Sequence, residues 1–298
     1  MQVITVDVGL LGDKYGEELC SHLEAGNILI LENAPFAPAE ADRQFLRDQK
    51  QSESSAFKNV AYKPHLNKTT GLSADSGMDC EAVHRILSQY SKGAVEFVGS
   101  MLPRYGKLWK LDFATYRPIE EEGRDLPLKR RNDLMHVDAF PTRPTNGGRI
   151  LRIFTNIHPS KPRVWVTSDP FDELCRDYAM AAGLNNATSA SSAVKRALGQ
   201  AAKLVGMKAP RRTAYDDFMQ GFHHYLKANE KFQTERMRDT TSFPAGTTWM
   251  AFTDQIAHSV KSGQYAIEQT CIVPVAALVK PECAPVAILA RMTGRKMV

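Results

Sequence analysis

Short alternating runs in the second half of the sequence limit the folds that this chain can adopt. From Lys107 onward, five runs alternate or are rich in β-branched and aromatic residues: KLWKLDFATYR, RILRIFTNI, VWVT, TTWMAFT and QYAIEQTCIV. Each run is bounded by Pro, Gly or Asn, which are common in turns. A period of two places successive side chains on opposite faces of a sheet. The pattern therefore predicts an antiparallel β core.

Segments with helical periodicity flank this core. A polar helix is predicted from Ala37 to about Lys50, and Cys80 to Leu102 places apolar residues at steps of three and four. Residues 170–240 are helical again, with aromatic residues on one face of DDFMQGFHHYLKANEKF. We therefore predict an α+β, mainly β, fold in which a double-stranded β-helix, or jelly roll, carries helical cover.

The predicted organisation is a single domain over residues 1–298. Residues 1–105 form a helical cover with edge strands, and residues 106–169 form the first half of the β core. Residues 170–240 are a helical insertion, and residues 241–298 form the second half of the core. This length suits one large domain with an insertion.

Composition and charge limit the cellular compartment and the classes of binding partner that we expect. The five cysteines are scattered and form no CxxC pair, so a reducing cytoplasm is expected. The N-terminus lacks a basic leader, and no apolar stretch approaches the roughly 20 residues that span a bilayer. The net charge of +5 permits an acidic substrate or a membrane surface. Nucleic acid is not expected, because the clusters Lys129-Arg130-Arg131 and Arg211-Arg212 lack interleaved aromatics.

The motif LMHVDAF carries the first candidate site residues. His136 and Asp138 are two apart on a predicted strand, so both side chains point to the same face. Two histidines and one carboxylate form the facial triad of non-haem iron(II) oxygenases, which leaves adjacent positions open for other ligands. The motif alone is a weak signal, because a surface His-Asp pair has the same spacing.

The third ligand is predicted to be His258. The segment FPAGTTWMAFTDQIAHSVKSGQYAIEQT is interpreted as a turn, a strand, a short loop carrying this histidine, and another strand. That order is expected if a second hairpin closes over a metal bound by the first. His223 and His224 are adjacent on a predicted helix and are interpreted as surface or satisfied histidines.

Two arginines are candidates for binding anions. Arg152 lies in an apolar strand and needs an anionic partner there. We predict that it binds the distal carboxylate of a dicarboxylate cosubstrate, with Asn156 on the same face adding a hydrogen bond. A structural salt bridge remains the alternative for Arg152. Arg117 ends the preceding predicted strand and is expected to bind the substrate anion or the cosubstrate.

The run MHVDAFPTRPTNGGRILRIFTNIHP, together with the segment around His258, resembles the Kdo hydroxylases of Gram-negative bacteria. That resemblance implies an Fe(II)/2-oxoglutarate/O2-dependent dioxygenase. The reaction would hydroxylate C3 of 3-deoxy-D-manno-oct-2-ulosonic acid (Kdo) in the inner core of lipopolysaccharide, giving the sugar Ko. It also implies that His136, Asp138 and His258 are the iron ligands and that Arg117 and Arg152 are active-site arginines.

The same resemblance implies a substrate such as Kdo-lipid A, and hence peripheral contact with the cytoplasmic face of the inner membrane. Arg117 and the run Lys129, Arg130 and Arg131 are then expected to face the acidic lipid-linked sugar. Many members of the wider dioxygenase superfamily place an arginine about ten residues after the distal histidine, where this chain has Glu268. We therefore predict that Arg152, on another strand, binds the distal carboxylate of 2-oxoglutarate in place of that arginine.

Two alternatives stay open at this point. One is the same chemistry on another acidic lipid, sugar or amino acid. The other is a non-catalytic metal-binding β-sandwich that senses or stores a ligand. Succinate release that depends on both iron and substrate would separate turnover from mere binding.

Overall fold

The computed structural model describes residues 1–9, 13–49, 59–72, 79–189 and 211–298. All five alternating runs form strands, as predicted. They are β5 (Lys110–Arg117), β6 (Arg149–Asn156), β7 (Arg163–Pro170), β9 (Thr248–Phe252) and β11 (Ala266–Val273). The other strands are β1 (Val3–Val6), β2 (Ile28–Leu31), β3 (Val60–Lys63), β4 (Lys68–Thr70), β8 (Asp239–Phe243) and β10 (Ile256–Ser262).

The strands make two sheets in a mixed α+β fold. The larger sheet has the order β1-β2-β9-β6-β11-β5-β3-β4, and the smaller has the order β10-β7-β8. The pairings are antiparallel except for β1 with β2. Aromatic rings join the sheets: Phe154 and Trp249 of the larger sheet contact Trp165 of the smaller one at centroid distances of 5.0 and 5.7 Å.

Helices cover the outer face of the larger sheet. The two helices predicted in the N-terminal part are present as α2 (Glu40–Asp48) and α3 (Cys80–Met101). Asp79 caps α3 by accepting hydrogen bonds from two backbone amides, and the helix buries an apolar face against β3, β5 and β11. Two further helices, α1 (Asp13–Glu24) and α4 (Pro103–Gly106), also belong to this cover.

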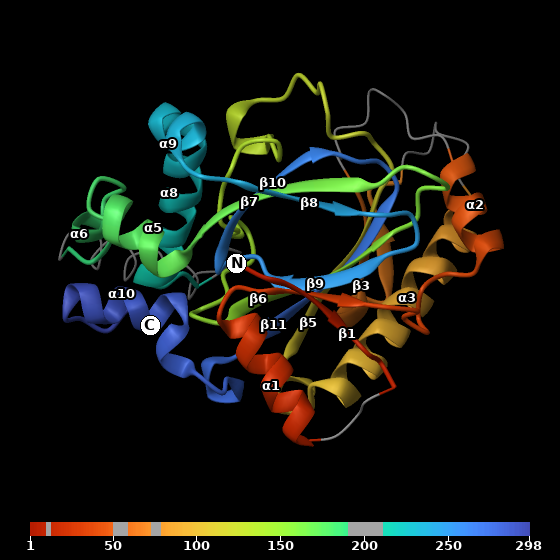
Figure 1. Ribbon diagram of the computed structural model, residues 1–298, viewed down its shortest axis with the longest axis horizontal. Coiled ribbons are helices and arrows are strands. Elements are labelled where there is room, and N and C mark those ends of the chain that lie inside the picture. The colour runs from red at the N-terminus through yellow and green to blue at the C-terminus, as the bar shows by residue number, and fades with distance from the viewer. Residues whose placement is uncertain (10–12, 50–58, 73–78, 190–210) are drawn as a thin grey trace, which may run out of the picture.

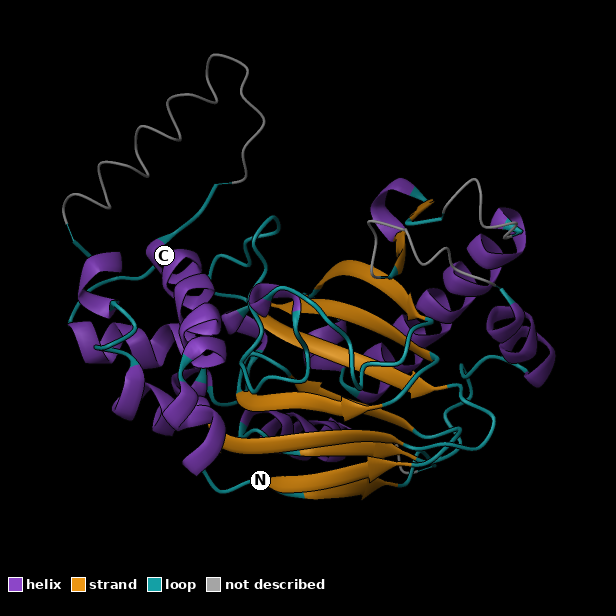
Figure 2. Cartoon of the chain, turned by 90° about the horizontal axis from the view of Figure 1, so that it is seen from above, coloured by secondary structure: helices purple, strands orange, loops and turns teal. Residues whose placement is uncertain are grey.

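The predicted helical insertion gathers at one end of the sheets (Figures 1 and 2). It contains α5 (Phe171–Tyr178), α6 (Leu184–Ala187), α8 (Ala214–Ala228) and α9 (Glu230–Glu235). The C-terminal helix α10 (Pro285–Thr293) lies beside them, inside a range that the sequence assigned to the β core. In the described part of the chain, no helix is long and apolar enough to cross a membrane.

Candidate metal and anion site

His136 and Asp138 do not lie on a regular strand, which corrects the sequence prediction. Their segment is held by an isolated bridge to β10, in which His136 and His258 exchange backbone hydrogen bonds of 3.0 and 2.9 Å. The amide of Asp138 donates to the carbonyl of Thr253 at 2.8 Å. His258 was predicted in a loop but lies within β10. The bridge brings together residues that are far apart in the sequence.

The rings of His136 and His258 are held in the same way. Nδ1 of each lies close to the carbonyl oxygen two residues earlier, Leu134 at 2.7 Å and Ile256 at 3.1 Å. A carbonyl can only accept, so Nδ1 carries the proton and Nε2 keeps its lone pair. The ring centroids are 4.9 Å apart, and Nε2 of His136 lies 3.6 Å from Oδ1 of Asp138. An imidazole nitrogen and a carboxylate oxygen are therefore close enough to bind the same metal ion.

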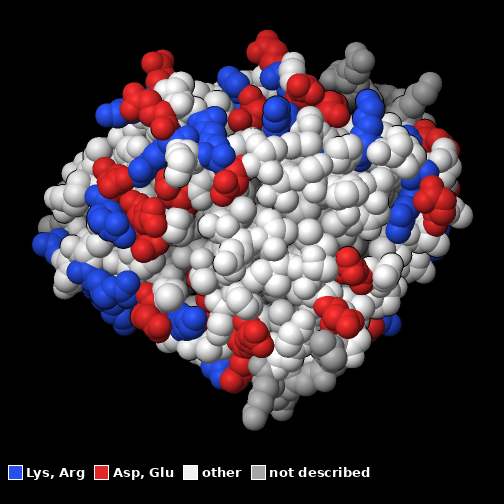
Figure 3. Space-filling model, viewed as in Figure 1, with Lys and Arg blue, Asp and Glu red and all other residues white. Residues whose placement is uncertain are grey.

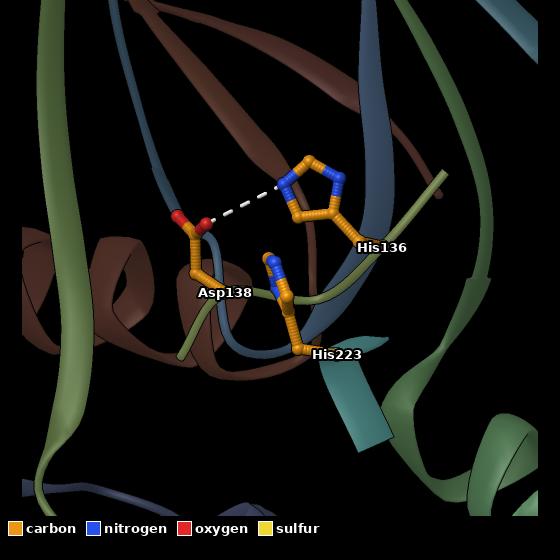
Figure 4. A group of neighbouring side chains, drawn as sticks. All are labelled: His136, Asp138 and His223. Atoms are coloured by element: carbon orange, nitrogen blue, oxygen red, sulfur yellow. Dashed lines mark ion pairs between the residues drawn. The ribbon is translucent and has the colours of Figure 1, made fainter. Parts of the chain in front are cut away.

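A third histidine joins this group. His223 of α8 donates from Nδ1 to the carbonyl of Val137 at 2.8 Å, and its ring lies 4.7 Å from that of His136. Figure 4 shows both rings and the Asp138 carboxylate converging on one space, with one ligand atom of each residue within 4.8 Å of the others. The sequence interpretation of His223 as a surface or satisfied histidine missed this position. His224 is half-buried and bonds to Gln220.

The electrostatics of the group suit a metal ion. Burial opposes ionisation of Asp138, but Arg152 and the neighbouring imidazoles outweigh it and hold the pKa of this carboxyl well below its usual value. Burial lowers the pKa of His136 and of His223, and it lowers the pKa of His258 to about 4. At neutral pH the site therefore offers a carboxylate and neutral imidazoles, the forms that bind metal ions.

A row of buried arginines and glutamates continues from Asp138. Nη1 of Arg152 lies 3.3 Å from Oδ2 of Asp138 and 3.7 Å from Oε2 of Glu268. Arg117 donates from Nε to Glu268 Oε2 at 3.0 Å and pairs with Glu121, which also pairs with Arg163. Both candidate arginines thus have acidic partners. Burial opposes ionisation of Glu268, and the two arginines beside it hold its pKa below the usual value.

These groups line one cavity of about 420 Å³. Its wall contains His136, Asp138, His258 and His223, with seven cationic side chains: Arg117, Lys129, Arg130, Arg143, Arg152, Arg163 and Lys227. Such a volume is ordinary for a small-molecule site. The concentration of positive charge favours an anionic ligand.

Two predicted site residues do not line this cavity. The Asn156 amide donates to the carbonyls of Lys161, Phe243 and Pro244 at 3.0, 3.0 and 3.2 Å. Its Oδ1 accepts from the amide of His158, so these contacts favour a role in fixing the loop after β6. Arg131 pairs with Asp133. Sequence reasoning did not assign a site role to four further residues of the cavity wall: Arg143, Arg163, Trp165 and Lys227.

Unpaired buried donors show what the cavity can hold. Nε of Arg152, Nε of Arg163 and Nε1 of Trp165 are buried without a hydrogen-bond partner. A buried donor left unpaired costs about 1–3 kcal/mol, so three in one wall point to a ligand rich in acceptor oxygens. The nitrogen and oxygen donor set of two histidines and Asp138 matches a non-haem iron site. The residues therefore fit both an iron ion and an organic anion.

The family model described as 3-deoxy-D-manno-oct-2-ulosonic acid (Kdo) hydroxylase matches residues 10–296. The chain belongs to the Kdo hydroxylase family. No curated protein sequence matches it significantly.

Solved structures of the Kdo hydroxylase KdoO share this fold. The apo form, described as a non-heme Fe(II) alphaketoglutarate-dependent dioxygenase, has a TM-score of 0.84 and 29% identity, covering 100% of this chain and 98% of that one. The complex with alphaketoglutarate and Fe(III) has a TM-score of 0.83 and 29% sequence identity, and the match covers 100% of this chain and 98% of that one. The cobalt(II) complex has a TM-score of 0.84 and 30% sequence identity, and the match covers 99% of this chain and 97% of that one. The resemblance seen in the sequence is thus confirmed.

Proposed function

We propose that this protein is an Fe(II)/2-oxoglutarate/O2-dependent hydroxylase that converts Kdo of the lipopolysaccharide inner core to Ko by hydroxylating C3. The observation that carries the proposal is the convergence of two histidines and one carboxylate in a cationic cavity, in a chain of the Kdo hydroxylase family. The two facing sheets support a jelly roll, and the aromatic cluster between them supports a single domain over residues 1–298.

The proposed iron ligands are His136, Asp138 and His258. The paired hydrogen bonds between the backbones of the two histidines fix their spacing, and each ring is oriented by the same Nδ1 contact. His223 is the competing third ligand, because its ring lies 4.7 Å from that of His136. Among the described residues, the group whose ligand atoms lie within 4.8 Å of one another also contains His136, Asp138 and His223 but not His258. His223 comes from a helix outside the sheets, so its position relative to Asp138 depends on how α8 packs. The pair joined by backbone hydrogen bonds is the more rigid scaffold.

The proposed cosubstrate site uses Arg152. Arg152 and Trp165 both line the cavity, and each has a buried nitrogen donor without a hydrogen-bond partner. In the proposal these residues donate to carboxylate oxygens of 2-oxoglutarate. Glu268 lies between Arg152 and Arg117 and holds both guanidinium groups in place. Arg117 then supports Arg152 through this shared glutamate and can also reach an anion from the side of β5.

The bound iron, 2-oxoglutarate and O2 would supply the oxidation, in which one oxygen atom enters succinate and the other replaces C–H by C–OH as CO2 leaves. The protein's own residues bind, orient and exclude water. The neutral imidazoles and ionised Asp138 keep the ligand set ready at neutral pH. Phe154 and Val260 give the wall an apolar portion that limits water.

The substrate side of the proposal is Kdo-lipid A. Lys129 and Arg130 are exposed residues of the cavity wall and can meet the acidic sugar or the lipid phosphates. Peripheral contact with the cytoplasmic face of the inner membrane follows from a lipid-linked substrate. A Lys or Arg near an anionic membrane surface contributes about 1 kcal/mol.

The test is turnover by purified protein supplied with Fe(II), 2-oxoglutarate, O2 and Kdo-lipid A. We expect a product heavier by one oxygen, with one succinate formed for each hydroxylated sugar. Succinate formed only with another acidic sugar or lipid would favour the alternative substrate. Iron and 2-oxoglutarate binding without any succinate would favour the non-catalytic sandwich. Mass spectrometry of core sugars with and without the gene tests the same reaction in cells.

A further inference from the structure

Lys227 differs from four of the arginines in the cavity wall. Arg117, Arg152 and Arg163 each lie within 4.0 Å of a carboxylate oxygen, and Arg143 is paired with Asp112. Lys227 is only 3% exposed, yet no described carboxylate lies within 4.0 Å of its ammonium group. Its one described hydrogen bond is a long one of 3.4 Å to the carbonyl of Lys129. A buried cation without an anionic partner is costly unless a ligand provides one.

The position of Lys227 separates it from the proposed cosubstrate arginine. Arg152 contacts Asp138, Asp138 contacts His136, and the ring of His136 contacts that of His223. Lys227 follows His223 by four residues on α8, so both side chains lie on the same helix face toward the cavity. Arg152 therefore enters the cavity wall from the larger sheet, and Lys227 enters it from the helical insertion.

The proposed substrate needs a cation at this second position. Kdo is a sugar acid whose carboxyl carbon is bonded to C2, next to the C3 that is hydroxylated. Because C3 must lie close to the iron, the carboxylate must also lie inside the cavity. The distal carboxylate of 2-oxoglutarate occupies the arginine side in our proposal. The sugar carboxylate therefore requires a different partner.

We propose that Lys227 binds the carboxylate of the sugar acid substrate and thereby positions C3 at the iron site. This inference rests on the proposed function and names the residue that recognises the acidic group of the substrate. A flexible ammonium with three donors suits a single carboxylate that must be placed beside a metal centre. It also assigns the helical insertion a role in substrate selection.

The first measurement needs no variant. Binding of a Kdo methyl glycoside and of its C1 carboxamide is compared by calorimetry under anaerobic conditions, with protein loaded with Fe(II) and 2-oxoglutarate. We expect the acid to bind roughly ten- to a hundredfold more tightly than the amide, as one charge-assisted hydrogen bond implies. Equal binding of acid and amide would overturn the inference.

The second measurement uses Lys227→Met, which keeps the length of the side chain without its charge. It should lose roughly ten- to a hundredfold in acid binding and should no longer distinguish acid from amide, while Lys227→Arg should recover part of the discrimination. The KM for 2-oxoglutarate should stay within about twofold of the parent. Lys231→Met, at a position where the side chain is 75% exposed, is the matched control.

The outcomes separate the two proposals. Full discrimination in Lys227→Met would reject the role of Lys227 while leaving Kdo hydroxylation intact. A parent protein that binds iron and 2-oxoglutarate but neither binds nor hydroxylates Kdo would reject the proposed function and this inference together.

Discussion

The two histidines assigned to iron differ from His223 in how the fold holds them. His136 and His258 are joined through their backbones, whereas His223 is tied to Val137 only through its ring. We expect His136→Ala, Asp138→Ala and His258→Ala each to lose bound iron and turnover, because a triad missing one ligand binds iron poorly. His223→Ala should retain iron at close to one ion per chain. Metal content after gel filtration measures this.

The metal content of two variants distinguishes His258 from His223 as the third iron ligand. Iron retained in His258→Ala and lost in His223→Ala would make His223 the third ligand. Circular dichroism of each variant excludes unfolding as the cause.

Arg152 is expected to determine the affinity for 2-oxoglutarate. Arg152→Lys removes the planar pair of donors and should raise the KM for 2-oxoglutarate roughly ten- to a hundredfold, because a charge-assisted hydrogen bond contributes about 1.5–3 kcal/mol. The KM for the sugar substrate should change by less than about threefold. Steady-state kinetics with each substrate varied in turn gives both values. The opposite split would place Arg152 at the sugar.

Lys227 should lower the stability of the ligand-free protein. Burial lowers its pKa to about 8, while a lysine in the unfolded chain titrates near 10.4. Below pH 8 the group is charged in both states, so its full burial cost is present. Between about pH 8 and 10.4 the unfolded state binds more protons, so this cost falls and stability rises with pH.

Lys227→Met should therefore raise the free energy of unfolding by about 1–3 kcal/mol at pH 7, and this gain should shrink toward pH 10. Urea unfolding of both proteins across this range measures the difference. A destabilised variant at pH 7 would show that the ammonium has a partner that stabilises it without substrate. A gain in stability together with loss of substrate binding is the usual signature of a functional group.

At the scale of elements, the N-terminus of α8 controls where His223 and Lys227 lie. Asp216 forms a capping box with Thr213 and also accepts hydrogen bonds from the amides of Thr145 and Asn146. These last two residues belong to the loop between Asp138 and β6. One buried carboxylate therefore ties the helical insertion to the segment that follows the His-Asp motif.

Asp216→Ala should cost about 2–4 kcal/mol of stability, because it leaves the amides of Thr145, Asn146 and Thr213 without this charged acceptor. Asp217→Ala is the matched control, since Asp217 pairs with Arg212 near the surface and such pairs contribute about 0–1 kcal/mol. Equal losses in the two variants, measured by urea unfolding, would mean that the link to the loop contributes little.

The sequence predicted the central strands better than the elements around them. The five alternating runs became strands because their side chains meet a core on at least one face of a sheet. The short strands β1, β2 and β8 were not placed, since short segments carry little periodicity. The helices α1 and α10 were not placed either. His258 lies in a strand because β10 pairs with β7, a tertiary contact that local sequence does not encode.

Candidate site residues were predicted where the local sequence distinguished them from their neighbours. His136 and Asp138 are two residues apart, and Arg152 lies in a conspicuously apolar run. His223 and Lys227 belong to an ordinary amphipathic helix, so nothing local distinguishes them from residues that face solvent. Asn156 shares a face with Arg152, yet its amide is used by a loop that only the folded chain brings to it.

At the scale of the whole molecule, charge is unevenly arranged. Figure 3 shows a face whose acidic and basic residues are mixed around the margin, with a broad uncharged centre. This face offers no single-sign patch of the kind that binds nucleic acid. The cavity, by contrast, has seven cationic side chains in its wall, and two of them, Lys129 and Arg130, are exposed.

Salt should therefore weaken binding of the acidic substrate without releasing the iron. Exposed charges are screened over about 8–10 Å at physiological ionic strength, whereas iron ligation is short-range and buried. Raising the salt concentration from about 0.05 to 0.5 M should raise the KM for Kdo-lipid A several-fold without loss of iron. Lys129→Gln/Arg130→Gln should raise that KM at low salt and flatten its salt dependence, because the screened charges are gone.

Arg117→Gln should behave differently, because Arg117 is buried and paired with Glu268 and Glu121. Its loss should impair turnover at every salt concentration. Lys92→Gln/Lys231→Gln removes the same charge as the double variant of the cavity rim, from side chains that are 77% and 75% exposed and lie outside the cavity wall. If this control flattens the salt dependence as much as Lys129→Gln/Arg130→Gln does, net charge and not the rim attracts the substrate. If only the rim variant does so, these two cations guide the acidic lipid to the cavity.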